Sequence, residues 1–211
     1  MVVIEFALCR LKPDYEQTGF FGVGRLCQQI QDTWIRENQP HRLQDKPYSS
    51  LSAFFLQNTE LPHFLITAAW DSPERHGLWL RSVENMGVLV KLREYIADVP
   101  NGVVVFHMDP AGSEIELRGD LFAQEAPFSL CTLSVSSRQK ESVQEKYRSI
   151  EAQARISKPS SRVWAGWRIE KDDDFEELVI FWNQGVLDGQ LDDLLSTPDA
   201  EHEFRQFQNF E

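Results

Sequence analysis

The alternation of hydrophobic and polar positions predicts a strand followed by a helix at the start of the chain. Residues 2 to 11 alternate with the period of a strand, which places Ile4, Phe6 and Leu8 on one face and smaller apolar side chains on the other. Because both faces are apolar, we expect this strand to be covered on both sides. In residues 20 to 38 the apolar positions recur every three or four residues, which predicts a helix with one buried stripe.

A hairpin and a second helix are predicted next. Residues 50 to 58 and 63 to 70 have strand patterns and are joined by a short turn, as in a hairpin. The run Ser72-Pro73-Glu74 then combines an N-cap, a proline at the first helical position and an acid in the first turn, so it predicts a helix start. Ser82 indicates a break within that helix, and residues 103 to 108 predict a fourth strand. The order is that of a split βαβ, ferredoxin-like unit.

The same pattern restarts after a charged segment with proline and glycine, residues 109 to 126, which we interpret as a linker with an extra edge strand at residues 114 to 122. The elements predicted beyond it are a strand at 128 to 135, a helix at 138 to 155, strands at 162 to 169 and 176 to 182, and a short helix at 186 to 195. Thr197-Pro198-Asp199 repeats the cap, proline and acid signature. It predicts a last helix containing Phe204 and Phe207.

Two corresponding positions indicate a diverged internal duplication. Trp182-Asn183 ends a strand as Trp70-Asp71 does, and a cap signature follows each pair at similar spacing. We therefore predict an α+β fold of tandem ferredoxin-like units, residues 1 to 108 and 127 to 211. The second unit lacks an obvious fourth strand, and the edge strand of the linker would take that place.

Composition and charge narrow the classes of partner. The chain has 211 residues and a formal net charge of −12, with a sequence pI near 4.9. An acidic surface repels phosphate backbones and anionic lipid headgroups, so neither nucleic acid nor a membrane surface is an expected partner. No run of about 20 apolar residues is present, and the first residues lack a basic leader, so we expect a cytoplasmic protein.

The three cysteines, Cys9, Cys27 and Cys131, are widely spaced and form no CxxC pair. We therefore expect buried thiols in a reducing compartment, with neither a disulfide framework nor a zinc site.

The segment from the third strand to the fourth resembles the antibiotic-biosynthesis monooxygenase type of dimeric α/β barrel. The residues that carry the resemblance are Trp70, Ser72, Glu74, His76, Trp79-Leu80 and Ser82. It is clearest over residues 1 to 108 and weaker over 126 to 211. Members of that family are single units that dimerise, so the resemblance implies a pseudo-dimer within this chain.

The resemblance implies a range of activities and no single reaction. The superfamily includes cofactor-free monooxygenases and cyclases of phenolic or polyketide compounds, haem-degrading enzymes and stress-responsive proteins. The haem-degrading relatives carry a histidine ten residues after the tryptophan that matches Trp79. This chain has Leu89 there, which argues against haem.

Two histidines are candidate catalytic residues. His76 lies in the first turns of the second predicted helix, where it acts as a base near neutral pH or is a surface side chain beside Glu74 and Arg75. His107 shares a strand face with Val103 and Val105. It points into the cavity if that face lines the barrel, and is a core histidine if that face packs on helices.

The candidate substrate-binding residues are less specific. Trp70 and Trp79 would wall a pocket for a flat substrate, although core packing is the plainer role for Trp70. Arg10 at a strand end would bind a carboxylate or phenolate, or reach solvent. His63 begins a strand, and Tyr48 is a phenol donor on the preceding loop.

Two functions remain open from the sequence. The first is an enzyme without metal or other cofactor that oxygenates, cyclises, dehydrates or decarboxylates a phenolic or polyketide-like small molecule of secondary metabolism. The second is a protein of the same fold that binds a small molecule, or responds to stress, without catalysis. No nucleotide-binding glycine motif, nucleophile elbow or zinc motif is present, and whether two chains pair as a homodimer stays open.

Overall fold

Eight strands close into one barrel in the computed structural model, which describes residues 2–43, 51–113, 127–157, 162–171, 174–183 and 191–210. The strands are β1 (Val3–Arg10), β2 (Ser52–Leu56), β3 (His63–Trp70), β4 (Val103–Pro110), β5 (Phe128–Ser136), β6 (Val163–Arg168), β7 (Phe175–Asn183) and β8 (Glu201–Asn209). The helices are α1 (Gln17–Asn38), α2 (Pro73–Leu80), α3 (Val83–Leu92), α5 (Lys140–Ser157) and α6 (Asp192–Leu195), with a 3₁₀ turn, η1 (Pro40–Leu43).

The two halves of the barrel share one strand order. Around the barrel the strands run β1-β3-β2-β8-β5-β7-β6-β4, and all neighbours are antiparallel. Each half therefore carries its first strand between its third and its fourth. The halves meet along two seams, β2 with β8 and β4 with β6.

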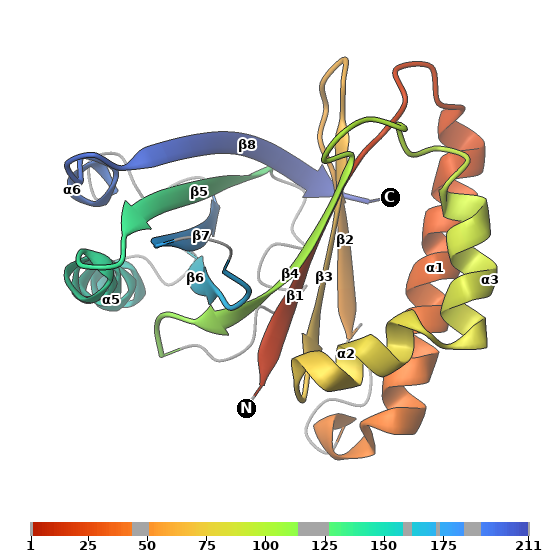
Figure 1. Ribbon diagram of the computed structural model, residues 1–211, viewed down its shortest axis with the longest axis horizontal. Coiled ribbons are helices and arrows are strands. Elements are labelled where there is room, and N and C mark those ends of the chain that lie inside the picture. Colours follow the sequence, from red (N-terminus) through yellow and green to blue (C-terminus); the bar gives the residue numbers. More distant parts are fainter. Residues whose placement is uncertain are drawn as a thin grey trace.

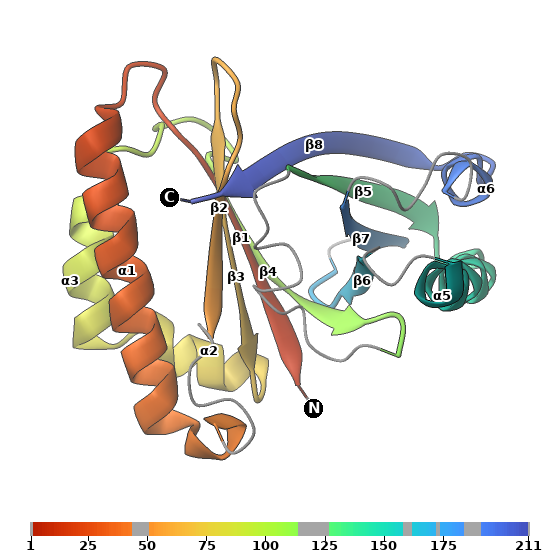
Figure 2. The ribbon, with the colours of Figure 1, turned by 180° about the vertical axis from the view of Figure 1, so that it is seen from behind.

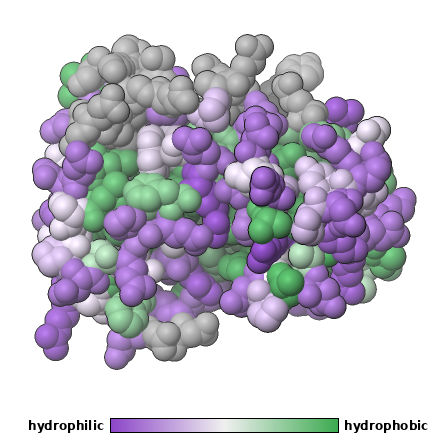
Figure 3. All heavy atoms as spheres, turned by 90° about the horizontal axis from the view of Figure 1, so that it is seen from above, coloured by the Kyte–Doolittle hydropathy of each residue, from purple (hydrophilic) through white to green (hydrophobic). Residues whose placement is uncertain are grey.

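The helices cover two opposite sides of the barrel. Helices α1, α2 and α3 lie against the first half, and α5 and α6 lie against the second (Figure 1), as the view from behind also shows (Figure 2). Seen from above, the surface carries mainly hydrophilic side chains with smaller hydrophobic patches between them (Figure 3). In the described part of the chain, no helix is both long and apolar enough to cross a bilayer.

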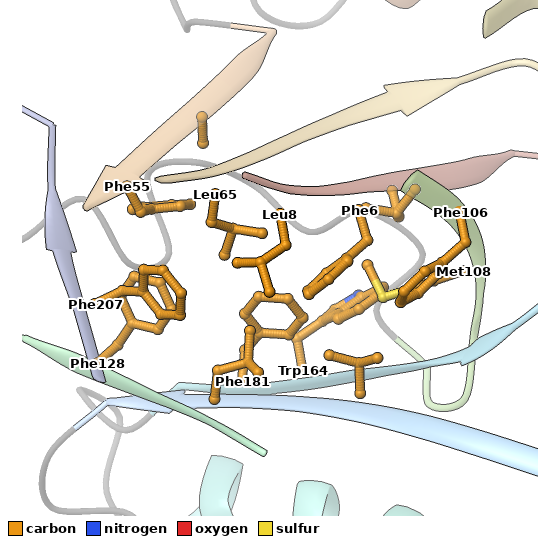
Figure 4. Close-up of a cluster of buried hydrophobic side chains, with 14 residues drawn as sticks. Phe6, Leu8, Phe55, Leu65, Phe106, Met108, Phe128, Trp164, Phe181 and Phe207 are labelled. Carbon is orange, nitrogen blue, oxygen red and sulfur yellow. The ribbon is translucent and has the colours of Figure 1, made fainter. Parts of the chain in front are cut away.

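The centre of the barrel is filled with apolar side chains. Aromatic and aliphatic residues of the first half face those of the second half across the interior (Figure 4). The buried cluster consists of Ile4, Phe6, Leu8, Ala53, Phe55, Leu65, Phe106, Met108, Phe128, Leu130, Trp164, Val179, Phe181 and Phe207. Among the described residues, these buried side chains pack against one another across the barrel centre.

The predicted alternation of the first strand is confirmed. Ile4, Phe6 and Leu8 enter the barrel interior, whereas Ala7 and Cys9 pack outward against α1 and α3. The outer face of the second half packs in the same way on α5 and α6. All three cysteines are buried, as expected.

The predicted last helix is wrong, because residues 201 to 209 form strand β8, which pairs with β5 and β2. Phe204 and Phe207 are three residues apart, as on a helix, but they lie on opposite faces of β8: Phe207 is buried in the interior and Phe204 is half exposed. Asp199 adopts a positive φ of 58°, so the proline and acid after Thr197 form a turn into β8. The expectation that the second half lacks a fourth strand is wrong for the same reason.

Other boundaries bear out the sequence pattern. Ser72 caps α2 and Ser82 caps α3, so the predicted break lies where expected. Helix α5 begins and ends within two residues of the prediction. The edge strand predicted at 114 to 122 and the first half of the short helix predicted at 186 to 195 lie outside the described residues, and α6 lies in the second half of that range.

We expect Gly166→Ala to destabilise the fold, because an added Cβ would lie 2.6 Å from the Trp164 ring and 2.8 Å from the Met108 Cβ. Overpacking of this kind costs about 1–3 kcal/mol of unfolding free energy. The control Gly87→Ala, with no atom within 4 Å of the added Cβ on an exposed turn of α3, should gain about 0.5–1 kcal/mol. Urea unfolding measures both, and a Gly166→Ala variant as stable as the parent would contradict a filled interior.

Candidate functional site

The inward face of the barrel changes from apolar to polar at one end. The strand registers place Ser134 of β5 beside Glu177 of β7 and Glu201 of β8. On β6, Arg168 follows Trp164 at inward positions, and its Nη1 lies 3.7 Å from Oε1 of Glu177. Charged side chains thus continue the row of inward positions that is apolar deeper in the barrel.

A pocket of about 560 Å³ opens at this end, and we call it the mouth pocket. Its wall consists of Ser134, Arg168, Glu170, Lys171, Phe175, Glu177, Asp199 and Glu201. The size suits a small molecule, and four carboxylates with two cations give the wall both acid–base and charge-stabilising groups.

Arg168 and Glu177 form a polar centre in the mouth pocket. Burial raises the pKa of Glu177 above its ordinary value, although Arg168 lies beside it. The guanidinium of Arg168 stacks over the Phe106 ring, with Cζ 4.7 Å from the ring centroid. Within the described part of the chain its buried Nε makes no hydrogen bond.

Glu170 joins the mouth pocket to His107 on the neighbouring strand β4. His107 Nδ1 lies 2.5 Å from Glu170 Oε1, and the His107 backbone N–H donates to Oε2 at 2.8 Å. Partial burial alone would raise the pKa of Glu170, but these two hydrogen bonds bring it below its ordinary value. The wall therefore holds two carboxyl groups, Glu177 and Glu170, with pKa shifts of opposite sign.

His107 also contacts a row of buried polar groups on the outer face of the barrel. His107 Nε2 lies 2.8 Å from Nδ1 of His76, a fully buried side chain of α2. His76 Nε2 is 3.4 Å from Oε1 of Glu5 on β1, within ion-pair distance but not aligned as a hydrogen bond. We call Glu5, His76, His107 and Glu170 the tetrad.

Two uncharged side chains donate hydrogen bonds to Glu5, the innermost member of the tetrad. The Trp70 indole donates to Glu5 Oε2 at 2.9 Å and the Gln31 amide donates to the same atom at 3.0 Å. Burial alone would raise the pKa of Glu5, but the charge of His76 and the hydrogen bonds bring it below its ordinary value. Trp70 also stacks on the His76 ring, with centroids 4.8 Å apart.

The two predicted catalytic histidines are thus brought together, although not inside the barrel. Phe106 and Met108 point into the interior, and His107, between them, lies on the outer face beneath α2. Of the two alternatives for His107, the structure shows the face that packs on a helix. Its link to the mouth pocket is indirect, through Glu170.

The predicted substrate-binding residues divide into two groups. Trp70 and Trp79 pack with Trp34 in a buried cluster under α1 and α2, and neither is among the residues that line the mouth pocket. Arg10 and His63 are cross-strand partners at the polar end of the barrel. Tyr48 lies outside the described residues.

Arg168, Glu170 and Glu177 line the mouth pocket but were missed by the sequence analysis. A signal was present: Arg168 and Glu177 occupy the same strand faces as Trp164 and Val179, which are core positions. Among the described residues, no group of three or more histidine, cysteine or acidic side chains is placed to hold a metal ion.

Solved structures with the same fold were found by comparison, whereas no protein-family model and no curated sequence matches the chain. A candidate monooxygenase from Fusobacterium nucleatum superposes with a TM-score of 0.65 at 10% identity, over 100% of this chain and 93% of that chain. One from Lactobacillus acidophilus gives 0.61 at 8%, over 100% and 94%. An anthrone oxidase-like protein gives 0.55 at 9%, over 99% and 90%. The likeness to these structures establishes the fold.

We expect the stability of the protein to fall as the pH drops from about 6.5 to about 4, partly through His63. Burial, with the charges of Arg205 and Arg10, lowers the pKa of His63 to about 4. The unfolded chain binds a proton there at about pH 6.5, so it holds more protons than the folded chain between these values and stability is lost. Because solvent screens this partly exposed ring, His63→Gln should recover about 1 kcal/mol of unfolding free energy at pH 4.5.

Urea unfolding at several pH values measures this effect. His202→Gln, at an exposed histidine, is the matched control and should leave the pH dependence unchanged. Identical pH profiles for His63→Gln and the parent would contradict the assignment.

Proposed function

We propose that the protein is a monooxygenase-like enzyme that removes a proton from a small phenolic or polyketide-like molecule in the mouth pocket and oxygenates it without a cofactor. One observation carries this proposal: two carboxyl groups with oppositely shifted pKa values, Glu177 and Glu170, share the pocket wall with Arg168. Such a pair separates the roles of base and acid in many enzymes. The solved structures of the same fold described as monooxygenases or anthrone oxidase-like agree with this reaction class.

Glu177 is the proposed general base. Its raised pKa makes the carboxylate a stronger base than an ordinary glutamate, and the open pocket brings an acidic C–H or phenolic O–H within reach. The anion that forms would lie against Arg168, whose positive charge stabilises it. Arg10 and His63, at the same end of the barrel, are proposed to contact the rest of the substrate.

The oxygenation balances without a further reductant. The substrate carbanion adds to O2, and the new C–O bond gives a peroxide anion that takes a proton to become a hydroperoxide. Loss of water then converts the original CH2 to a carbonyl group, so one oxygen atom enters the product and the other leaves as water. The protein supplies base and anion stabilisation, and the carboxylate of Glu170 is proposed to pass a proton from His107 to the peroxide.

We further propose that residues 1 to 108 and 127 to 211 are tandem units of one repeat, with 109 to 126 as their linker. Their shared order of elements and shared strand order support this. The tetrad has no counterpart in the second unit: the registers put Cys131 and Phe204 where the first unit has Glu5 and His107. Among the described residues, the tetrad therefore occurs once.

The second candidate is a protein that binds a small molecule without converting it. The apolar barrel centre favours it, because the mouth pocket, as the described residues form it, is open to solvent at one end and is not an enclosed cavity. Such a protein would bind the same class of ligand at the mouth pocket and consume no oxygen.

Oxygen consumption with 1,8-dihydroxyanthrone as the probe tests the enzyme. Glu177→Gln removes the base and should lower kcat by about 100-fold or more. Arg168→Met removes the anion stabiliser and should also cost about 100-fold. An oxygen electrode measures both, with product identified by absorbance.

The control is Glu145→Gln, which changes an exposed carboxylate of α5 and should leave the rate unchanged. Equal turnover by Glu177→Gln and by the parent protein would contradict the assignment of Glu177 as the base. Binding of the probe with no oxygen uptake in the parent would favour the second candidate.

A further inference from the structure

The tetrad is built across the seam between the two halves of the barrel. Glu5, His76 and His107 belong to the first half, and Glu170 follows β6 of the second half. The inner members are almost fully buried, with 4%, 0% and 8% of Glu5, His76 and His107 exposed. The side chain of Glu170 is 44% exposed and lines the mouth pocket. The tetrad therefore connects side chains that are buried from solvent to the solvent-exposed mouth pocket.

The number of protons in the tetrad follows from its contacts. Three gaps separate its four members: Glu170 to His107, His107 to His76, and His76 to Glu5. The first two gaps are hydrogen bonds, and each needs one proton because otherwise two lone pairs would face each other. The third gap is an ion-pair contact at 3.4 Å, and it also needs a proton on His76 Nε2 because otherwise a lone pair would face the Glu5 carboxylate. Two neutral imidazoles carry only two ring protons. The third proton makes one imidazole positively charged, or it protonates a carboxylate.

The surroundings place that third proton on the imidazoles. Glu5 already accepts hydrogen bonds from Trp70 and Gln31, and Glu170 accepts one from the His107 backbone, so both are held as carboxylates. A proton on either imidazole then lies next to one carboxylate. Its transfer between the two rings requires movement only across the 2.8 Å gap from His76 Nδ1 to His107 Nε2.

We infer that the tetrad is a proton relay that holds one excess proton, shared by His76 and His107, and delivers it to Glu170 in the mouth pocket. With the charge on His107, its Nδ1 proton passes to Glu170, which hands it to the acceptor in the pocket. His107 is left neutral, with its Nε2–H still donating to His76. Solvent returns one proton through the exposed carboxyl of Glu170, which restores the charge.

The other charged or titratable groups near the relay do not replace these roles. Glu74 on α2 is exposed and acts on His107 only through its charge. Burial, together with the charge of Glu5, raises the pKa of the Cys9 and Cys27 thiols to about 12, so both stay neutral. Glu5 is thus the anion that keeps the excess proton in the interior. It is a positioning residue, since it acts through His76.

NMR of the ligand-free protein with ¹⁵N-labelled histidine tests the relay directly. At neutral pH we expect ring ¹⁵N shifts of His76 and His107 that together correspond to one positive charge. Glu5→Gln keeps the shape of the side chain and removes the anion. Its amide donates to His76 Nε2, so both rings should become neutral. The control Glu151→Gln changes a carboxylate of α5 that is also 4% exposed and should leave these shifts unchanged.

Two neutral rings in the parent protein would overturn the inference, whether or not the Glu5 variant folds. Unchanged histidine shifts in a folded Glu5→Gln would also overturn it.

The role of the relay in turnover rests on the proposed function. With 1,8-dihydroxyanthrone as the substrate, Glu5→Gln should lower kcat about 10-fold, leave KM unchanged and alter the pH dependence of kcat. A parent that consumes no oxygen but shows the shared charge would refute the proposed function and leave the relay standing.

Discussion

The structure depends on the apolar filling of the closed barrel. Each half contributes strands with one face that only the other half can bury, and Phe6, Leu65 and Phe55 meet Phe181, Trp164 and Phe128 across the interior. Burial of such faces is the main favourable term in folding. Neither half could cover this surface alone, so closure along the two seams and the packing of the interior form together.

The filled centre determines where chemistry can occur. With apolar side chains at the middle of the barrel, charged groups lie at one open end, where Arg168 and Glu177 keep contact with water, and on the outer face, where His76 of α2 lies over Glu5. The β4–β6 seam joins these places, because Glu170 from one half bonds to His107 from the other. A site assembled across a seam in this way exists only in the closed barrel.

Elements whose signals lie in neighbouring residues were predicted well from the sequence. Elements that depend on pairing between distant strands could not be predicted. The caps at Ser72 and Ser82 and the alternation of β1 depend on neighbouring residues, so sequence reasoning found them. Strand β8 depends on partners about 70 residues earlier on β5, and its two phenylalanines have a spacing that also suits a helix.

The candidate site shows the same division. His76 and His107 were singled out as residues, but their 2.8 Å contact depends on how α2 lies over β4. Glu170 is 63 positions from His107 and becomes its partner only when the barrel closes. The inward direction of Arg168 and Glu177 likewise depends on which strand faces line the interior.

The central claim is that small molecules bind at the polar end of the barrel and not among the buried tryptophans of the outer face. Backbone NMR shifts recorded during a titration with 1,8-dihydroxyanthrone test it most directly. The account predicts perturbations clustered at Ser134, Arg168, Glu170 and Glu177, with residues around Trp34 and Trp79 unchanged. Shift perturbations centred on Trp34 and Trp79, with no perturbation of the residues that line the mouth pocket, would contradict it.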